Sequence, residues 1–238
     1  CVSIDGVDMR QVDLTEPEET RSLEGCDPDT IVHCAGLADV DRCEQNPEVA
    51  RRLNVTAAEH VATLADRIGA RLLHISTDAV FDGQDGRYSE EDAPNPINVY
   101  GETKLTAEER VQSIHNDCVV VRTNFYGWNE TDASSLAEWM LSTLRNGEEL
   151  TGFKNSYFSP IYTGDLAECL LNLSGKSVTG SLHVAGSDRL NKLGFAHELA
   201  DVFGFDDSLI TPITRSDVDL AAPRGTDLSL DTSRAEST

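Results

Sequence analysis

The segment LLHISTDAVFDG, from Leu72 to Gly83, joins an apolar run directly to hydroxyl and carboxylate side chains. Such a continuous apolar run is typical of a strand that is covered on both faces in a parallel sheet. In open parallel sheets, ligands bind beyond the carboxyl ends of the strands. We therefore expect Ser76, Thr77 and Asp78 to lie at a binding edge. The alternative is an Asp-rich turn that merely reverses the chain.

Similar apolar runs alternate with helical patterns along the first half of the chain. The runs TIVHCAG and CVVVRT occupy residues 30–36 and 118–123. Apolar residues at helical spacing cover residues 46–69, where Gly69 ends the pattern, and a second helical pattern begins at Asn98. Strand–helix–strand repetition implies right-handed crossovers between parallel strands. We therefore predict an α/β fold, with a doubly wound parallel sheet and helices on both of its faces.

The rhythm changes after Thr123, where a polar loop with aromatic residues begins. Helices are expected at 136–145 and 191–203, and a last buried strand at 180–186. We predict two domains. A Rossmann-like dinucleotide-binding domain takes residues 1–122, with 155–186 returning to it, and a smaller C-terminal substrate-binding lobe takes 123–154 and 187–238.

The start of the chain lacks an expected feature of a dinucleotide-binding domain. Such a domain normally begins with a strand and a glycine-rich turn that holds the pyrophosphate at a helix N-terminus. No G-x-G-x-x-G motif is present before the first apolar run. We therefore expect a fragment that begins roughly thirty residues late, the length of a strand–helix–strand unit. Without that turn, we expect weak cofactor binding and an inactive fragment.

The chain is strongly acidic, with 42 Asp and Glu against 19 Lys and Arg and a net charge of −23. This charge repels nucleic-acid phosphates and anionic lipid, so neither is an expected partner, and no apolar run is long enough to span a membrane. Acidity spread along the whole chain predicts a halophilic protein, and a mildly acidic mesophile is the alternative. Six cysteines without CxxC or zinc-like His spacing indicate a reducing cytoplasm and no metal site.

The segment NVYGETKLTAEE, from Asn98 to Glu109, places a tyrosine and a lysine four residues apart. Positions i and i+4 share one helical face, so Tyr100 and Lys104 can approach each other. A nearby ammonium lowers the pKa of a phenol from its usual value of ~10, which makes Tyr100 a usable proton donor. A lone YxxxK pair is a weak signal. The combination of this pair with the hydroxyl of Thr77, at the end of the preceding strand, is a stronger signal.

A resemblance to a known family extends beyond these residues. The segments STDAVFDG (76–83) and YSEEDAPNPINVYGETK (88–104) resemble the extended short-chain dehydrogenase/reductase superfamily, and within it the dTDP-4-dehydrorhamnose reductase branch. Five more segments are similar to motifs of that branch: VDLTEPEE (12–19), ADVDRCEQNPEVARRLN (38–54), RTNFYG (122–127), SPIYTGDLAE (159–168) and APRGTDLSLDTSR (222–234). The resemblance therefore covers nearly the whole chain.

The resemblance implies NADPH- or NADH-dependent reduction of the C4 ketone of a nucleotide-linked deoxysugar, in dTDP-rhamnose biosynthesis. It also implies a cytoplasmic enzyme, with a homodimer as the expected assembly. Tyr100 would protonate the forming alkoxide, Lys104 would bind the nicotinamide ribose, and Thr77 would hydrogen-bond the carbonyl oxygen. The implied cofactor-binding residues are Asp13, Leu14, Cys34, Ala35, Gly36, Asn54 and Ser76, together with Tyr100 and Lys104. The implied substrate-binding residues are Asp78, Asn124, Phe125, Trp128 and Arg224.

The sequence departs from the family pattern at three places. Ala79 replaces a Tyr of the pocket, and Phe125 replaces a Trp. The run His33-Cys34-Ala35 resembles a sister group, the regulatory β subunit of methionine adenosyltransferase. Two alternatives therefore stand beside the reductase. One is a non-catalytic dinucleotide-binding subunit, and the other is a sugar-nucleotide epimerase or dehydratase relative that retains NAD.

Overall fold

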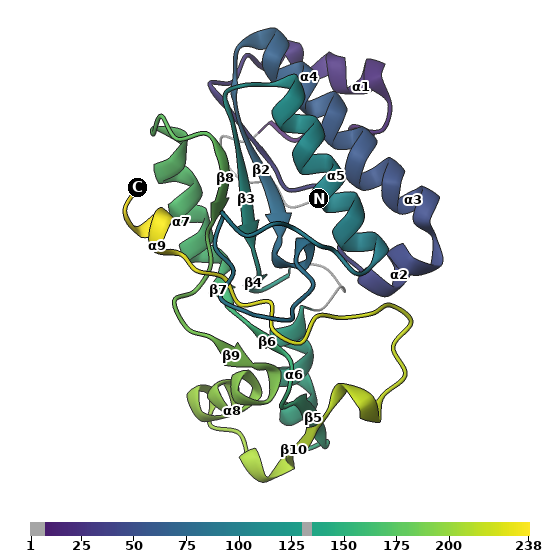
Figure 1. The fold of residues 1–238 in the computed structure, drawn as a ribbon, viewed down its shortest axis with the longest axis vertical. Helices are drawn as coiled ribbons and strands as arrows, with labels where there is room; N and C mark the ends of the chain where they lie inside the picture. The colour runs from purple at the N-terminus through teal and green to yellow at the C-terminus, as the bar shows by residue number, and fades with distance from the viewer. Residues whose placement is uncertain (1–7, 130–134) are drawn as a thin grey trace.

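A four-stranded parallel sheet forms the centre of the larger of two units (Figure 1). The computed structural model describes residues 8–129 and 135–238. The strands β1 (Thr30–His33), β2 (Arg71–Thr77), β3 (Cys118–Thr123) and β8 (Gly180–His183) lie in the order β1-β2-β3-β8. In register, Thr77 lies opposite Thr123. The carboxyl ends of β2 and β3 therefore meet at one edge of the sheet.

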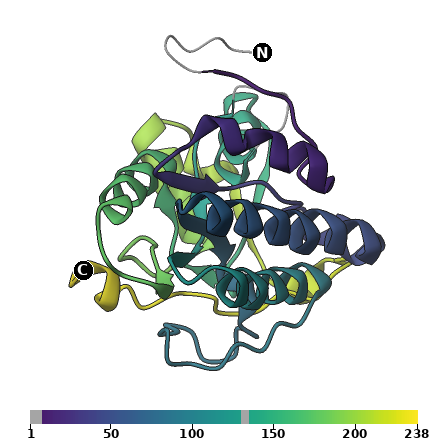
Figure 2. The same ribbon diagram turned by 90° about the horizontal axis from the view of Figure 1, so that it is seen from above.

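Helices cover both faces of this sheet, as Figure 2 shows from above. Helices α4 (Ala57–Ile68) and α5 (Val99–Ile114) pack on one face with Leu72 and Val120. Helix α7 (Thr163–Ser174) packs on the other face with Leu73, Ile75, Val119, Val121 and Leu182. Neighbouring residues of a strand point to opposite faces of the sheet. When both faces are buried, the residues at odd and at even positions must therefore all be apolar. This explains the continuous apolar runs and confirms the predicted α/β architecture.

The helix expected at 46–69 is not one regular helix. It consists of α3 (Pro47–Arg51), a π-helical turn (Arg52–Thr56) and α4, and Gly69 ends it in a left-handed conformation with φ of 71°. Short π-helical turns insert an extra residue and often occur at functional sites. This one contains Asn54. Before it lie α1 (Pro17–Arg21), a 3₁₀ turn (Ser22–Cys26) and α2 (Val40–Gln45).

The second, smaller unit has a core of its own, which includes Met140, Leu150, Phe158, Phe195 and Leu199. Helices α6 (Leu136–Arg145) and α8 (Lys192–Phe203) pack on the parallel pair β5 (Leu150–Phe153) and β10 (Ile210–Ile213). Two short pairs connect the units: β4 (Phe125–Tyr126) with β7 (Ile161–Tyr162), and β6 (Tyr157–Phe158) with β9 (Leu190–Asn191). Phe158 therefore belongs to the smaller unit, although the predicted boundary placed residues 155–186 in the larger one.

The C-terminal tail packs differently from its predicted assignment to the smaller lobe. Leu230 bridges to Tyr88 and joins a buried cluster with Val80 and Phe81, and α9 (Ser233–Glu236) contacts β8. The amide of Tyr88 donates to the Ser229 carbonyl at 2.9 Å. The tail thus runs as a strap from the smaller unit back to the sheet, shown in yellow in Figure 1. In that position Leu230 is buried.

Candidate active site

The start of α5 is held against the end of β2. Asn98 caps the helix, because its side-chain oxygen accepts from the Gly101 amide at 2.9 Å. A Cβ on Gly101 would stand 2.2 Å from the Ala79 carbonyl oxygen, so only glycine permits this approach. The close contact brings Tyr100 beside Thr77, near enough for the Thr77 hydroxyl to affect the pKa of the phenol.

Three polar side chains meet where β2 and β3 end. Asp78 is buried, with 2% of its surface exposed. Its two carboxylate oxygens accept from the Asn124 amide at 2.7 Å and from the Thr77 hydroxyl at 3.1 Å. The Thr77 oxygen also accepts from the Ala79 amide at 3.1 Å. Burial raises the pKa of Asp78, and the hydrogen bond from Asn124 opposes that rise. Asp78 therefore orients Thr77 and Asn124.

The pKa of Tyr100 differs from the sequence prediction. Burial raises it to about 12, and the Thr77 hydrogen bond acts in the opposite direction. Lys104 is not among the groups that shift this pKa, and its ammonium donates to the Ile75 carbonyl at 2.7 Å. The expectation that Lys104 lowers the phenol pKa is therefore wrong for this geometry. The position of Tyr100 and Lys104 on one helical face did not by itself determine the direction of the flexible lysine side chain.

Lys104 is itself buried, with 7% of its surface exposed. Burial lowers the pKa of Lys104 to about 8, and the charge of Glu108 one turn later raises it. The neighbouring imidazole of His33 has its pKa lowered to about 4 by burial and by the Lys104 charge. The ammonium lies against β2. It donates to the backbone oxygen of Ile75, which is two residues before Thr77. It can donate to oxygen atoms placed at the sheet edge.

Sequence reasoning missed a buried ion pair beneath the site. The guanidinium of Arg122 donates to both oxygens of Glu108, the shortest bond being 2.7 Å. The hydroxyl of Ser76 donates to the same carboxylate. Ser76, predicted to bind cofactor, thus uses its one proton inside the protein. The arginine in the run CVVVRT was the available signal, since an arginine inside a buried strand requires a partner.

The predicted cofactor residues form two separate groups, one after β1 and one before it. The group after β1 is exposed. Cys34, Ala35 and Gly36 form an exposed turn. Asn54 fixes this turn, because its side chain accepts from the Leu37 amide at 2.7 Å and donates to Thr103 of α5 at 3.0 Å. Near the N-terminus, Asp13 is exposed and accepts from Thr15, while Leu14 packs beside the α4–α5 face of the sheet.

The remaining predicted substrate residues are spread around the sheet edge. Phe125 is 51% exposed on β4, and Trp128 packs edge-to-face on Phe203 with ring centroids 6.0 Å apart. Arg224 pairs with Asp41 at 3.0 Å. Its charge also lowers the pKa of Arg215, a residue that sequence reasoning missed, although burial is the larger cause. Two guanidinium groups therefore lie close together in a strongly acidic chain.

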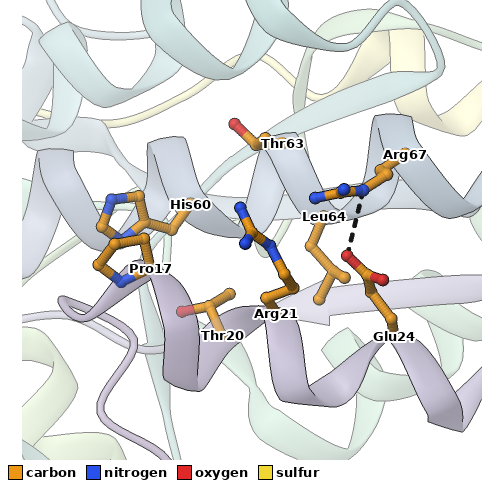
Figure 3. A pocket seen from close by; sticks show the side chains of 8 residues that line it. All are labelled: Pro17, Thr20, Arg21, Glu24, His60, Thr63, Leu64 and Arg67. Atoms are coloured by element: carbon orange, nitrogen blue, oxygen red, sulfur yellow. Dashed lines mark ion pairs between the residues drawn. The ribbon is translucent and has the colours of Figure 1, made fainter.

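A groove between α1 and α4 lies apart from these residues (Figure 3). It is lined by Pro17, Thr20, Arg21, Glu24, His60, Thr63, Leu64 and Arg67. Arg67 pairs with Glu24 at 3.2 Å across it. None of its lining residues belongs to the predicted site. Over residues 8–129 and 135–238, no cluster of three or more His, Cys, Asp or Glu could hold a metal ion.

Comparison with known proteins decides the family. A model of the RmlD substrate binding domain matches residues 2–238. The chain belongs to this family. It is 36% identical over 233 residues to the probable low-salt glycan biosynthesis reductase Agl14 of Haloferax volcanii, covering 96% of this chain and 78% of that protein. It is 34% identical over 236 residues to methionine adenosyltransferase 2 subunit beta of Rattus norvegicus, covering 96% of this chain and 70% of that protein.

A solved structure supports the same assignment to the RmlD family. The dTDP-4-dehydrorhamnose reductase of Bacillus anthracis, in complex with NADP, superposes with a TM-score of 0.87 and 28% identity, covering 92% of this chain and 78% of that chain. Together these matches confirm the predicted membership of the dTDP-4-dehydrorhamnose reductase branch and the Rossmann-like fold. Across the described part of the chain, no helix has the length and apolar character needed to cross a membrane.

Proposed function

We propose that this RmlD-family chain is an NAD(P)H-dependent oxidoreductase that reduces the 4-ketone of a nucleotide-linked 6-deoxysugar. The observation that carries the proposal is the approach of Tyr100 to Thr77 at the end of β2, with the Lys104 ammonium held against the same strand. The reductase relatives and the NADP-bound neighbour support the reaction class. The acidic charge and the free cysteines of the described residues support a reducing, salt-rich cytoplasm.

The residues present fit a nicotinamide cofactor. The exposed turn Cys34–Gly36 follows β1 at the carboxyl edge, where dinucleotides bind in open parallel sheets. The Cys34 thiol lies near Lys104: burial raises the pKa of the thiol, and the Lys104 charge acts in the opposite direction. The buried Lys104 ammonium has donors left for ribose hydroxyls besides its bond to Ile75. When bound, the cofactor supplies the hydride.

Each side chain at the edge then has one task. Tyr100 donates its proton to the oxygen that becomes an alkoxide, and its raised pKa keeps it protonated until that charge develops. Thr77 turns its hydroxyl from Asp78 toward the same oxygen and stabilises the developing charge. Asp78 and Asn124 hold Thr77 and the sugar in position. Arg215 and Arg224 offer paired positive charge to the diphosphate.

The test is NAD(P)H oxidation by the intact protein with dTDP-4-keto-6-deoxysugar at high salt. High salt is needed because a net charge of −23 repels itself unless it is screened. Tyr100→Phe should lower kcat by roughly 10²- to 10⁴-fold, the usual contribution of a general acid. Tyr157→Phe is the matched control, because its ring packs on Arg189 at 3.7 Å without requiring the hydroxyl. Equal turnover by Tyr100→Phe and wild type would reject the mechanism.

A second candidate function is a dinucleotide-binding regulatory subunit without turnover. It is favoured by the 34% identity to methionine adenosyltransferase 2 subunit beta and by Ala79, which replaces a pocket aromatic of the reductase branch. Binding to a methionine adenosyltransferase, together with no oxidation of NAD(P)H by any ketosugar, would support this role. Ketone turnover that depends on Tyr100 would exclude it.

A further inference from the structure

The hydrogen bonds of Asn54 have a fixed direction. The Leu37 amide can only donate, so the atom that faces it at 2.7 Å is the side-chain oxygen of Asn54. The side-chain nitrogen is then fixed as well. It donates to the Leu37 carbonyl at 3.2 Å and to the Thr103 hydroxyl at 3.0 Å, which uses both of its N–H groups. Asn54 therefore holds the residue that follows the turn at 34–36, the cofactor turn, and helix α5 at the same time.

Thr103 continues this connection along α5. Its hydroxyl oxygen accepts from Asn54, so its single proton is available for another partner. The hydroxyl donates that proton to the Tyr100 carbonyl at 2.9 Å. A continuous chain of hydrogen bonds thus runs from Leu37 through Asn54 and Thr103 to the backbone of Tyr100.

This chain of hydrogen bonds is enclosed by the protein. Asn54 and Thr103 expose 2% and 3% of their surface. The cofactor turn also lies against Asn54, because a Cβ on Gly36 would stand 2.9 Å from the Asn54 side-chain oxygen. A buried polar group that loses its partner is left unpaired away from water, which costs more than an exposed hydrogen bond contributes. Displacing any one member therefore affects the others.

Packing connects the same two segments independently. Leu37 is buried in a small cluster with Cys43 and Ala50, and Val99 and Tyr100 of α5 pack against this cluster. The Cys43 thiol donates to the Leu37 carbonyl at 3.4 Å. The residue after the cofactor turn is thus connected to the start of α5 by apolar contacts as well as by hydrogen bonds.

The polar character of Asn54 and Thr103 is informative. An apolar pair would close α5 onto the π-helical turn without any buried polar group to satisfy. Apolar contacts are not directional, whereas hydrogen bonds require one distance and one angle between their partners. Two buried side chains whose donors are all used therefore define one position of α5 relative to the cofactor turn.

We propose that Thr103 is a positioning residue, which together with Asn54 couples the cofactor turn to the proton donor Tyr100. This inference rests on the proposed reductase function. A cofactor bound at residues 34–36 holds that turn in place, and the hydrogen bonds through Asn54 and Thr103 then hold the first turn of α5. Tyr100 is thereby kept beside Thr77 when the cofactor is bound. By linkage, cofactor binding and the placement of the proton donor stabilise each other.

The test compares Thr103→Val with wild type in the intact protein. Valine keeps the shape of threonine and removes the hydroxyl. We expect the Kd for NADPH, measured by fluorescence titration, to rise roughly 3- to 10-fold, the loss of one neutral hydrogen bond. We expect kcat for ketosugar reduction to fall by up to about 100-fold through misplacement of the donor, with ketosugar KM unchanged. Thr103→Ser keeps the hydroxyl and should restore Kd and kcat, and an unchanged Kd and kcat in folded Thr103→Val would overturn the proposal.

Thr106→Val is the matched control on the same helix. The Thr106 hydroxyl donates to the Glu102 carbonyl at 2.8 Å, a bond of the same kind outside the Asn54 connection, so this variant should change neither constant. Equal effects of Thr103→Val and Thr106→Val would reflect helix stability alone and would contradict the coupling.

A double variant tests whether Asn54 and Thr103 act together. Asn54→Ala already breaks the connection, so adding Thr103→Val should raise the Kd for NADPH by less than about twofold more. If the two losses multiply instead, the residues act independently and the proposal is wrong.

Hydrogen exchange separates this inference from the proposed function, because it needs no turnover. Saturating NADPH should slow amide exchange at residues 99–105 in wild type and in Thr103→Ser, and this protection should be lost in Thr103→Val. Protection that persists in Thr103→Val would reject the coupling, whereas absent ketone reduction by wild type rejects the reductase proposal alone. If Thr103→Val does not fold, Thr103→Ala takes its place with the same expected outcomes.

Discussion

Replacing Glu108 by Gln tests how much the buried ion pair under the site contributes to stability. The pair is almost fully enclosed, with 5% of the Arg122 side chain and 3% of the Glu108 side chain exposed. The substitution keeps the shape and removes the charge, so the Arg122 guanidinium is left buried with a neutral partner. Breaking a buried pair from one side costs about 3–5 kcal/mol in unfolding free energy. That is a large share of a typical domain stability of about 5–15 kcal/mol.

The assay is urea-induced unfolding of the intact protein, followed by circular dichroism. Glu59→Gln is the control, because its pair with Arg110 at 3.3 Å leaves the arginine 61% exposed. An exposed pair contributes about 0–1 kcal/mol, so this variant should unfold near the wild-type midpoint. Replacing both partners, as Glu108→Leu with Arg122→Met, should restore most of the stability, because no buried charge then remains.

The same variant has a functional consequence. The charge of Glu108 raises the pKa of Lys104, so its removal should lower that pKa further and shift any alkaline decline in activity to lower pH. A stability loss under about 1 kcal/mol in Glu108→Gln would refute the reasoning, because it would mean that Arg122 reaches water.

Three further outcomes are expected. Gly101→Ala should lose most of its turnover and several degrees of melting temperature, because the new Cβ would stand 2.2 Å from the Ala79 oxygen. Gly175→Ala, whose Cβ would meet nothing nearer than 3.9 Å, should lose neither, and similar behaviour of the two variants would contradict the packing. Asn54→Ala releases the turn after β1 and should weaken NAD(P)H binding about tenfold by fluorescence titration, with ketosugar KM unchanged. Burial lowers the pKa of Lys104 to about 8, so its charged form is present below that pH and lost as the pH rises through it. The KM for NAD(P)H should therefore increase above pH about 8, and a flat profile there would count against the ribose role.

The local sequence pattern was sufficient to predict many of the strands and helices of the larger unit. The apolar runs predicted β2 and β3, because a strand buried on both faces must be apolar at every position. Asn98 predicted the start of α5 within one residue. The π-helical turn at 52–56 was not visible, since one inserted residue hardly changes apolar spacing. The route of the tail was equally hidden, because its cover over Tyr88 depends on contacts far apart in the chain.

The sequence by itself determined the α/β class, the family motifs and the identity of the hydroxyl, phenol and amine at the sheet edge, because each is encoded by spacing within one element or by motif. Only the tertiary structure decided the charge state of these groups and their neighbours. Desolvation raises the pKa of Tyr100 to about 12 and lowers those of Lys104 and Lys192 to about 8. Burial is a property of everything packed around a side chain, and no local pattern contains it.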